Sequence, residues 1–159
     1  MKRTSKPRVL FVCTGNSCRS QMAEGWLRHL AGDRFEVFSA GIRPTSVHSS
    51  AIQVMGEQGM DLSSHRSTSV DEFLGQPFDY VITVCGSANE ECPFFPGPAQ
   101  RFHWDIEDPA RVVGTEQEVL EAFRAVRDRL RKEVEAFVAT ARGEETEIVP
   151  RCWVKAGEG

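Results

Sequence analysis

The sequence lacks several features that would assign it to a particular class of protein. None of its apolar stretches approaches the roughly 20 residues of a membrane-spanning helix. The apolar run at residues 9–13 is also too short for the core of a signal peptide. We therefore expect a cytoplasmic protein that makes no contact with membranes. Repeats and low-complexity tracts are missing too, so 159 residues with 40% hydrophobic content predict one domain.

An excess of positive charge is also missing. The chain has 19 Lys and Arg against 23 Asp and Glu, which gives a formal net charge of −4 at pH 7. This balance argues against a general nucleic-acid binder. A negatively charged ligand would have to be attracted by a local site and not by the overall field.

The number and the spacing of the cysteines argue against a disulfide-stabilised protein and against a metal-binding protein. Their number is odd, so a framework of structural disulfides is not expected, and catalytic, redox or metal-binding roles gain weight. No two of them have C-x-x-C spacing, and the four histidines stand singly, so we predict no metal site and no cofactor. The five are Cys13, Cys18, Cys85, Cys92 and Cys152, of which the last has no evident role in catalysis.

Residues 8–20, RVLFVCTGNSCRS, have the pattern of an oxyanion-binding loop. Aromatic and β-branched residues predict a buried strand that ends at Cys13. Small and polar residues follow, and they tolerate the tight or left-handed backbone that turns successive N–H groups toward one anion. A helix then begins near Arg19, and its N-terminus favours anions and thiolates alike. The predicted loop comprises Thr14, Gly15, Asn16, Ser17, Cys18, Arg19 and Ser20.

Cys13 and Arg19 are the two reactive residues that this pattern predicts. Cys13 would be a thiolate nucleophile, and the planar guanidinium of Arg19 would match two oxygens of a tetrahedral oxyanion. The lysine-containing motif of a nucleotide P-loop is absent, so we expect no ATP or GTP site. The alternative is a buried thiol at a strand end and a surface arginine, because C-x5-R spacing also arises by chance.

Strands and helices alternate along the rest of the chain. This order predicts an α/β fold, a single domain with a four-stranded parallel sheet flanked by helices on both faces. The domain would span residues 1–142, with 143–159 as a C-terminal extension. The expected strands lie at 9–13, 35–41, 79–84 and 102–104, and the expected helices at 19–31, 51–58, 69–74 and 115–141.

Three more residues lie at the edge of this sheet where ligands bind, beyond the carboxyl ends of the strands. Cys13 and Cys85 each follow a strand, so their sulfurs can be close if those strands are neighbours. Cys92 comes seven residues later in a loop with Gly, Ser and Pro. A redox pair and two ordinary loop cysteines remain equally open interpretations of Cys85 and Cys92.

Asp108 is the candidate general acid. A thiolate that attacks a tetrahedral oxyanion expels an oxygen, and that oxygen needs a proton from a positioned acid. Asp108 follows the last predicted strand, and Pro109 restricts its backbone to an extended conformation. A plain Asp-Pro turn is the alternative.

Four short motifs occur together in this chain. They are C-T-G-N-S-C-R-S after a strand, S-A-G at 39–41, V-C-x6-C-P at 84–93 and D-P-A at 108–110. Together they resemble the thioredoxin-coupled arsenate reductases, which are built on the flavodoxin-like fold of low-molecular-weight protein tyrosine phosphatases. The resemblance covers roughly residues 8–140.

The resemblance implies reduction of arsenate to arsenite in arsenic detoxification. Cys13 would attack arsenate held by the loop amides and Arg19, while Asp108 protonates the departing oxygen. Cys85 would attack Cys13 and release arsenite, and Cys92 would attack Cys85. The resulting Cys85–Cys92 disulfide would be reduced by thioredoxin.

The resemblance also implies partners and one difference from some relatives. It implies a monomer that binds arsenate, with phosphate or sulfate as competitors, and thioredoxin. Asn16 and Ser20 match positions that keep the loop in shape. Some relatives bind potassium there; Asn16, Glu24 and Ser39 match, but Thr68 replaces the Asp, which argues against a potassium site.

Two other functions fit part of the pattern. A phosphatase would use Cys13, Arg19 and Asp108 to cleave phosphomonoesters through a phosphocysteine, but it has no use for Cys85 and Cys92. A thiol redox sensor without turnover would use the cysteines alone.

Overall fold

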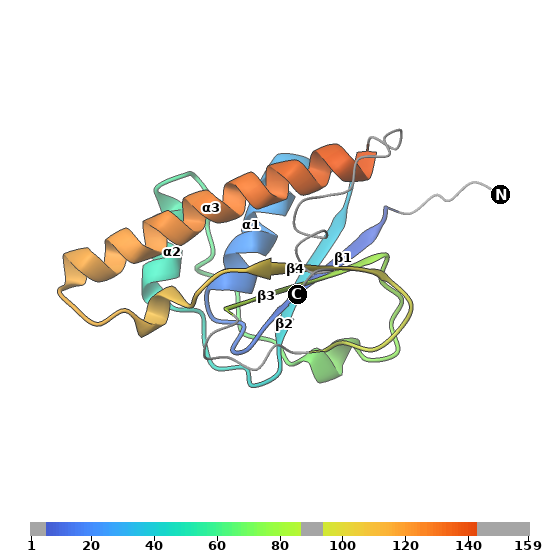
Figure 1. The fold of residues 1–159 in the computed structure, drawn as a ribbon, viewed down its shortest axis with the longest axis horizontal. Coiled ribbons are helices and arrows are strands. Elements are labelled where there is room, and N and C mark those ends of the chain that lie inside the picture. The colour runs from blue at the N-terminus through green and yellow to red at the C-terminus, as the bar shows by residue number, and fades with distance from the viewer. Residues whose placement is uncertain (1–5, 87–93, 143–159) are drawn as a thin grey trace.

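Four parallel strands form one sheet in the computed structural model, which describes residues 6–86 and 94–142 (Figure 1). The strand order is β2-β1-β3-β4, and the predicted four-stranded parallel sheet is confirmed. The strands are β1 Arg8–Cys13, β2 Glu36–Gly41, β3 Tyr80–Cys85 and β4 Gln100–Asp105. The helices are α1 Arg19–Ala31, α2 Ser49–Gly56 and α3 Glu116–Arg142, with 3₁₀ turns η1 Val70–Phe73 and η2 Pro109–Arg111.

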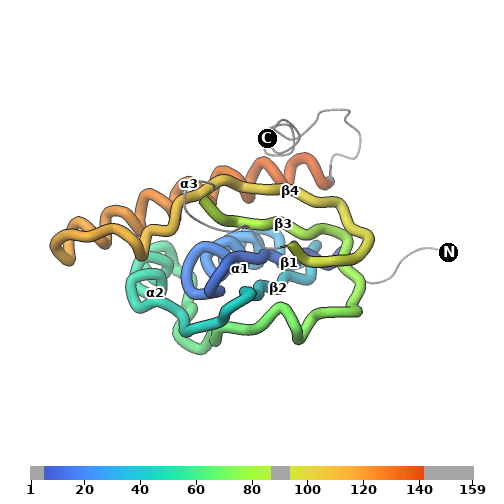
Figure 2. Tube along the Cα trace, turned by 60° about the horizontal axis from the view of Figure 1, so that its bottom comes forward, coloured from blue at the N-terminus to red at the C-terminus, as the bar shows by residue number. Residues whose placement is uncertain are grey.

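Helices cover both faces of the sheet, as predicted, but they do so unequally (Figure 2). Val9 and Phe11 of β1 face the core that the three α-helices cover. Leu10 and Val12 face the other core, where η1 is the only helical cover among residues 6–86 and 94–142, supplemented by side chains such as Phe95. Alternate residues of a strand point to opposite faces, which explains why β1 is apolar throughout.

The helix ends agree with the sequence in one case and differ in another. Thr115 and Glu118 cap α3 reciprocally: Glu118 N donates to Thr115 Oγ1 at 3.1 Å and Thr115 N to Glu118 Oε1 at 2.8 Å. Helix α2, expected at 51–58, begins two residues earlier and is capped by His48, whose Nδ1 accepts from Ser50 N at 3.0 Å. Within the described residues, no helix is both long enough and apolar enough to cross a membrane.

The edge of the sheet that carries the candidate site is set by the pairing of β1 with β3. Val12 pairs with Thr83, so Cys13 and Cys85 end neighbouring strands at the same edge. The two sulfurs were predicted to be close if these strands are neighbours, and the strands are neighbours. The predicted extension at 143–159 lies outside the described residues, and the domain boundary stays a prediction.

Candidate active site

The loop between β1 and α1 curves around the sulfur of Cys13. Asn16 adopts a left-handed backbone (φ 51°), as its place in the predicted loop requires, and its N–H donates to Cys13 Sγ at 3.2 Å. Three loop carbonyls accept hydrogen bonds from the segment that follows β2, an arrangement in which loop N–H groups can turn toward an anion. These bonds are Arg43 N to Thr14 O (2.9 Å), Thr45 N to Gly15 O (3.2 Å) and His48 N to Ser17 O (2.9 Å).

Gly41, the glycine of the S-A-G motif, lets the loop backbone pass close to the end of β2. A Cβ atom at this position would lie 2.7 Å from Asn16 N and 2.8 Å from Thr14 O. Both atoms belong to the backbone of the loop, so a side chain at residue 41 would displace it. This close approach explains why glycine follows serine and alanine here.

The side chain of Asn16 is the centre of a buried network of hydrogen bonds. Its Nδ2 donates to Ser20 Oγ at 2.8 Å and to Ser39 Oγ at 3.0 Å. Its Oδ1 accepts from Thr68 N at 2.8 Å and from Gln21 Nε2 at 3.0 Å. Ser20 Oγ in turn lies 2.9 Å from Cys13 Sγ.

Gln21 is a site residue that the sequence did not reveal. It is almost fully buried, and its amide also donates to the backbone carbonyl of Arg66 at 3.0 Å. Its Oε1 lies 2.9 Å from His65 Nδ1, and because an amide oxygen only accepts, His65 is the donor. A glutamine directly after the loop at a buried helix position was the available signal.

Arg19 and Asp108 lie side by side, as the predicted site requires. Arg19 is buried, its Nη1 donates to Ile106 O at 3.0 Å, and its Nη2 lies 3.6 Å from Asp108 Oδ2. Asp108 also caps η2 by accepting from Ala110 N at 2.9 Å. The Asp-Pro turn and the contact with the loop are therefore both present.

Cys18, the second cysteine of the loop, differs chemically from the first. Its Sγ donates to Asp108 Oδ1 at 3.4 Å. Burial raises the pKa of the Cys18 thiol, and the negative charges of Asp108 and Cys13 raise it further. Cys18 therefore stays protonated at neutral pH and acts as a donor to the carboxylate.

The cysteines at the sheet edge are in different covalent states. Cys13 and Cys18 are free thiols, whereas Cys85 is disulfide-bonded. The structure therefore contains no bond between Cys13 and Cys85. The other two cysteines, Cys92 and Cys152, lie outside the described residues.

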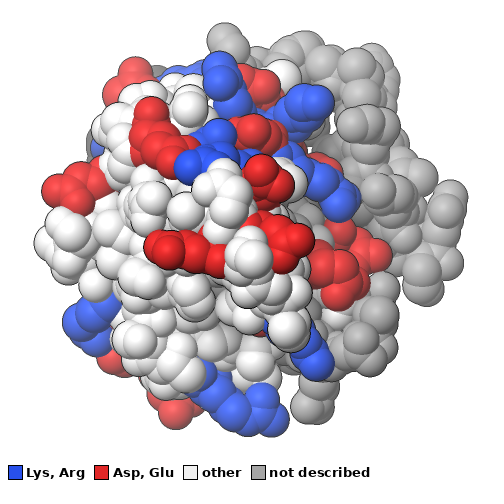
Figure 3. All heavy atoms as spheres, turned by 90° about the vertical axis from the view of Figure 1, so that its left-hand side faces the viewer, with Lys and Arg blue, Asp and Glu red and all other residues white. Residues whose placement is uncertain are grey.

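Charges of both signs surround this end of the molecule. Figure 3 shows the side that carries η2 and the start of α3, where acidic and basic side chains lie next to one another. Such a surface provides no field of one sign. Attraction of an anion is thus left to the loop amides, the N-terminus of α1 and Arg19.

Comparison with known proteins places this chain in a defined family. Residues 8–147 match the model of the family described as low molecular weight phosphotyrosine protein phosphatase. An arsenate reductase of Halalkalibacterium halodurans is 44% identical over 138 residues, which are 87% of this chain and 99% of that protein.

Solved structures show the same relationship. An arsenate reductase in the phosphate binding state has a TM-score of 0.69 at 35% identity, covering 84% of this chain and 98% of that one. A thioredoxin-dependent arsenate reductase of Corynebacterium glutamicum has a TM-score of 0.58 at 29% identity, covering 84% of this chain and 64% of that one.

Proposed function

The chain belongs to the low-molecular-weight phosphotyrosine protein phosphatase family, and on that basis we propose that it reduces arsenate to arsenite with thioredoxin as the electron donor. The observation that carries this proposal is the placement of Cys13. A free thiol lies in an anion-binding loop, on the strand next to that of the disulfide-bonded Cys85. A hydrolase needs the free thiol in the anion-binding loop, but it has no use for an oxidised cysteine on the next strand.

Cys13 begins the reaction. Its thiolate attacks the arsenic of an arsenate ion that the loop N–H groups and the Arg19 fork hold. One arsenate oxygen leaves as water, and Asp108, 3.6 Å from Arg19, supplies the proton. The Cys18 thiol and Ala110 N both donate to Asp108 Oδ1, so Oδ2, the oxygen that faces Arg19, is the one that passes the proton on.

Cys85 then carries the reduction itself. Its thiolate attacks Cys13 Sγ, the sulfur–arsenic bond breaks, and two electrons pass to arsenic, which leaves as arsenite. Cys92 attacks Cys85 in the resulting Cys13–Cys85 disulfide and frees Cys13. Thioredoxin reduces the Cys85–Cys92 disulfide, which returns the enzyme to its starting state. The oxidised Cys85 beside the free Cys13 supports this order.

Counting thiols tests this relay. The fully reduced protein carries five thiols, and one equivalent of arsenate removes two of them if the relay operates. Cys92→Ser stops turnover with thioredoxin and leaves a Cys13–Cys85 disulfide, which peptide mapping identifies. Unimpaired turnover by this variant would contradict the relay, and Cys152→Ser is the matched control, with unchanged turnover.

Phosphatase activity is the second candidate because the family model carries that description. The same loop and Asp108 would cleave a phosphomonoester through a phosphocysteine, as a side activity. Hydrolysis leaves all five thiols intact, so the thiol count separates the two reactions. Phosphate and sulfate are the expected competitors of arsenate. We place the reaction in the cytoplasm, where thioredoxin keeps thiols reduced, and assign it to a monomer.

A further inference from the structure

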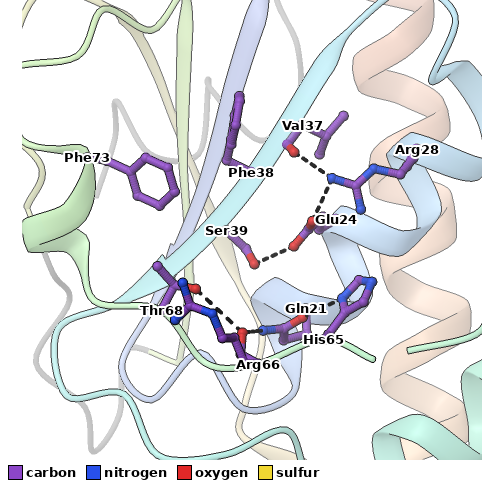
Figure 4. A pocket seen from close by; sticks show the side chains of 10 residues that line it. All are labelled: Gln21, Glu24, Arg28, Val37, Phe38, Ser39, His65, Arg66, Thr68 and Phe73. Carbon is purple, nitrogen blue, oxygen red and sulfur yellow. Dashed lines mark hydrogen bonds and ion pairs between the residues drawn. The ribbon is translucent and has the colours of Figure 1, made fainter. Parts of the chain in front are cut away.

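A pocket of about 270 Å³ lies behind the loop and is lined by the ion pair of Glu24 and Arg28 (Figure 4). The Glu24 side chain, only 12% exposed, places its Oε2 2.6 Å from Arg28 Nη2. The same nitrogen of Arg28 donates to Val37 O at 2.6 Å, so the guanidinium joins α1 to β2. A carboxylate that is withdrawn from water requires a paired positive charge, and Arg28 provides it.

The Glu24 carboxylate sets the direction of the hydrogen bonds that follow it. A carboxylate only accepts, so Ser39 Oγ donates to Glu24 Oε1 at 2.5 Å. Because the Ser39 hydroxyl gives its one proton to Glu24, its oxygen accepts a hydrogen bond from Asn16 Nδ2 at 3.0 Å. The amide of Asn16 is therefore turned with its nitrogen toward Ser39. The backbone N–H of Thr68, which only donates, lies on Asn16 Oδ1 and requires the same orientation.

This series of bonds continues to the sulfur of Cys13. Ser20 Oγ accepts from Asn16 Nδ2 at 2.8 Å, so its own proton is available to Cys13 Sγ at 2.9 Å. The Asn16 N–H donates to the same sulfur at 3.2 Å. A thiolate at Cys13 thus receives two hydrogen bonds, and the direction of the one from Ser20 follows from the charge on Glu24.

The same residues do not fit a potassium site. Potassium is coordinated by oxygen atoms, but Asn16 turns its nitrogen toward Ser39, and its oxygen already accepts from Gln21 and Thr68. One oxygen of Glu24 is paired with a guanidinium and the other accepts from Ser39. A potassium ion at Glu24 would meet a fixed positive charge.

We infer that Arg28 is a positioning residue that supplies, from within the chain, the positive charge beside Glu24. The loop around Cys13 then keeps its shape and its hydrogen-bond directions without a bound monovalent cation. The inference depends on the proposed function only for the nucleophilic role of Cys13. The hydrogen-bond network itself does not involve arsenate. An experiment can therefore contradict the role of Arg28 without contradicting arsenate reduction, and the reverse.

The first test compares ions on the unaltered reduced protein. The thermal midpoint of unfolding and the rate at which iodoacetamide alkylates Cys13, followed by peptide mass spectrometry, are measured in potassium, sodium and choline chloride at equal ionic strength. We expect the midpoints to agree within about 1 °C and the rates to agree within error. A midpoint or a rate raised by potassium alone would overturn the inference, whatever the protein does with arsenate.

The second test removes the charge. Arg28→Gln is expected to slow alkylation of Cys13 about ten-fold, the effect of one hydrogen bond to a charged group, and Arg28→Lys to recover part of the rate. Arg129→Gln is the matched control: Arg129 pairs with Glu133 at the same i,i+4 spacing and similar exposure, away from the loop. Alkylation of Arg28→Gln at the unaltered rate would contradict the inference. If this variant does not fold, the comparison of ions still decides.

Discussion

At the scale of single residues, the buried Cys18 thiol is expected to make the stability of the protein depend on pH. Because the folded protein raises the pKa of Cys18 above its ordinary value of 9.0, folded molecules keep the proton that unfolded molecules lose. The free energy of unfolding therefore falls as pH rises above 9.0, by about 1 kcal/mol per pH unit. Urea unfolding at pH 8 and pH 10 measures this decline.

Cys18→Ala isolates the contribution of this thiol from that of other titrating groups. The variant should lose less stability between pH 8 and pH 10 than the unaltered protein, because it has no buried thiol to ionise. Equal losses in the two proteins would show that the Cys18 thiol ionises as readily in the fold as in the unfolded chain.

The candidate site residues Cys13, Arg19 and Asp108 were predicted from what attack on a bound oxyanion needs. Their chemical roles stay predictions, and the structure places Arg19 next to Asp108. Gln21 and Arg28 were not found from sequence. Their importance depends on burial and on partners distant in the chain, the backbone of Arg66 for Gln21 and that of Val37 for Arg28.

At the scale of elements, the end of β2 and the loop after β1 depend on one close contact. Gly41→Ala places a methyl group against loop backbone and is expected to cost about 1–3 kcal/mol of stability and most of the activity. Urea unfolding and arsenate turnover measure the two effects.

Gly56→Ala is the control for that substitution. Gly56 lies in α2 and a Cβ there meets nothing within 4 Å, so alanine should stabilise the helix by up to about 1 kcal/mol and leave activity unchanged. If Gly41→Ala behaved like Gly56→Ala, the loop would not require the close approach at residue 41.

The periodicity of apolar residues predicted which segments are strands and which are helices. It predicted the ends of these elements less accurately. The runs that became β1 and β3 are apolar on both faces, which a parallel sheet requires. The segment 69–74, expected as a turn of helix, contains the 3₁₀ turn η1, in which Glu72 N donates to Ser69 O three residues before it and the Ser69 side chain caps the turn. Helix α2 begins at Ser49 and not at 51 because His48, which is not a usual capping residue, caps it.

At the scale of the whole molecule, strand order decided whether the separate motifs form one site. Alternation of strands and helices predicted a parallel sheet, but not which strands are neighbours. The observed order β2-β1-β3-β4 places β1 between the S-A-G motif and Cys85. The loop after β1, the end of β2 that supports it and Cys85 therefore lie along one edge of the sheet.

The most direct test of the proposed function is arsenate-dependent oxidation of NADPH by the purified protein with thioredoxin and thioredoxin reductase. The relay predicts one NADPH oxidised per arsenate reduced, with activity abolished in Cys13→Ser, Cys85→Ser and Cys92→Ser alike. No arsenate-dependent oxidation by the folded protein with active coupling enzymes, or unchanged activity in any one of these variants, would contradict the account.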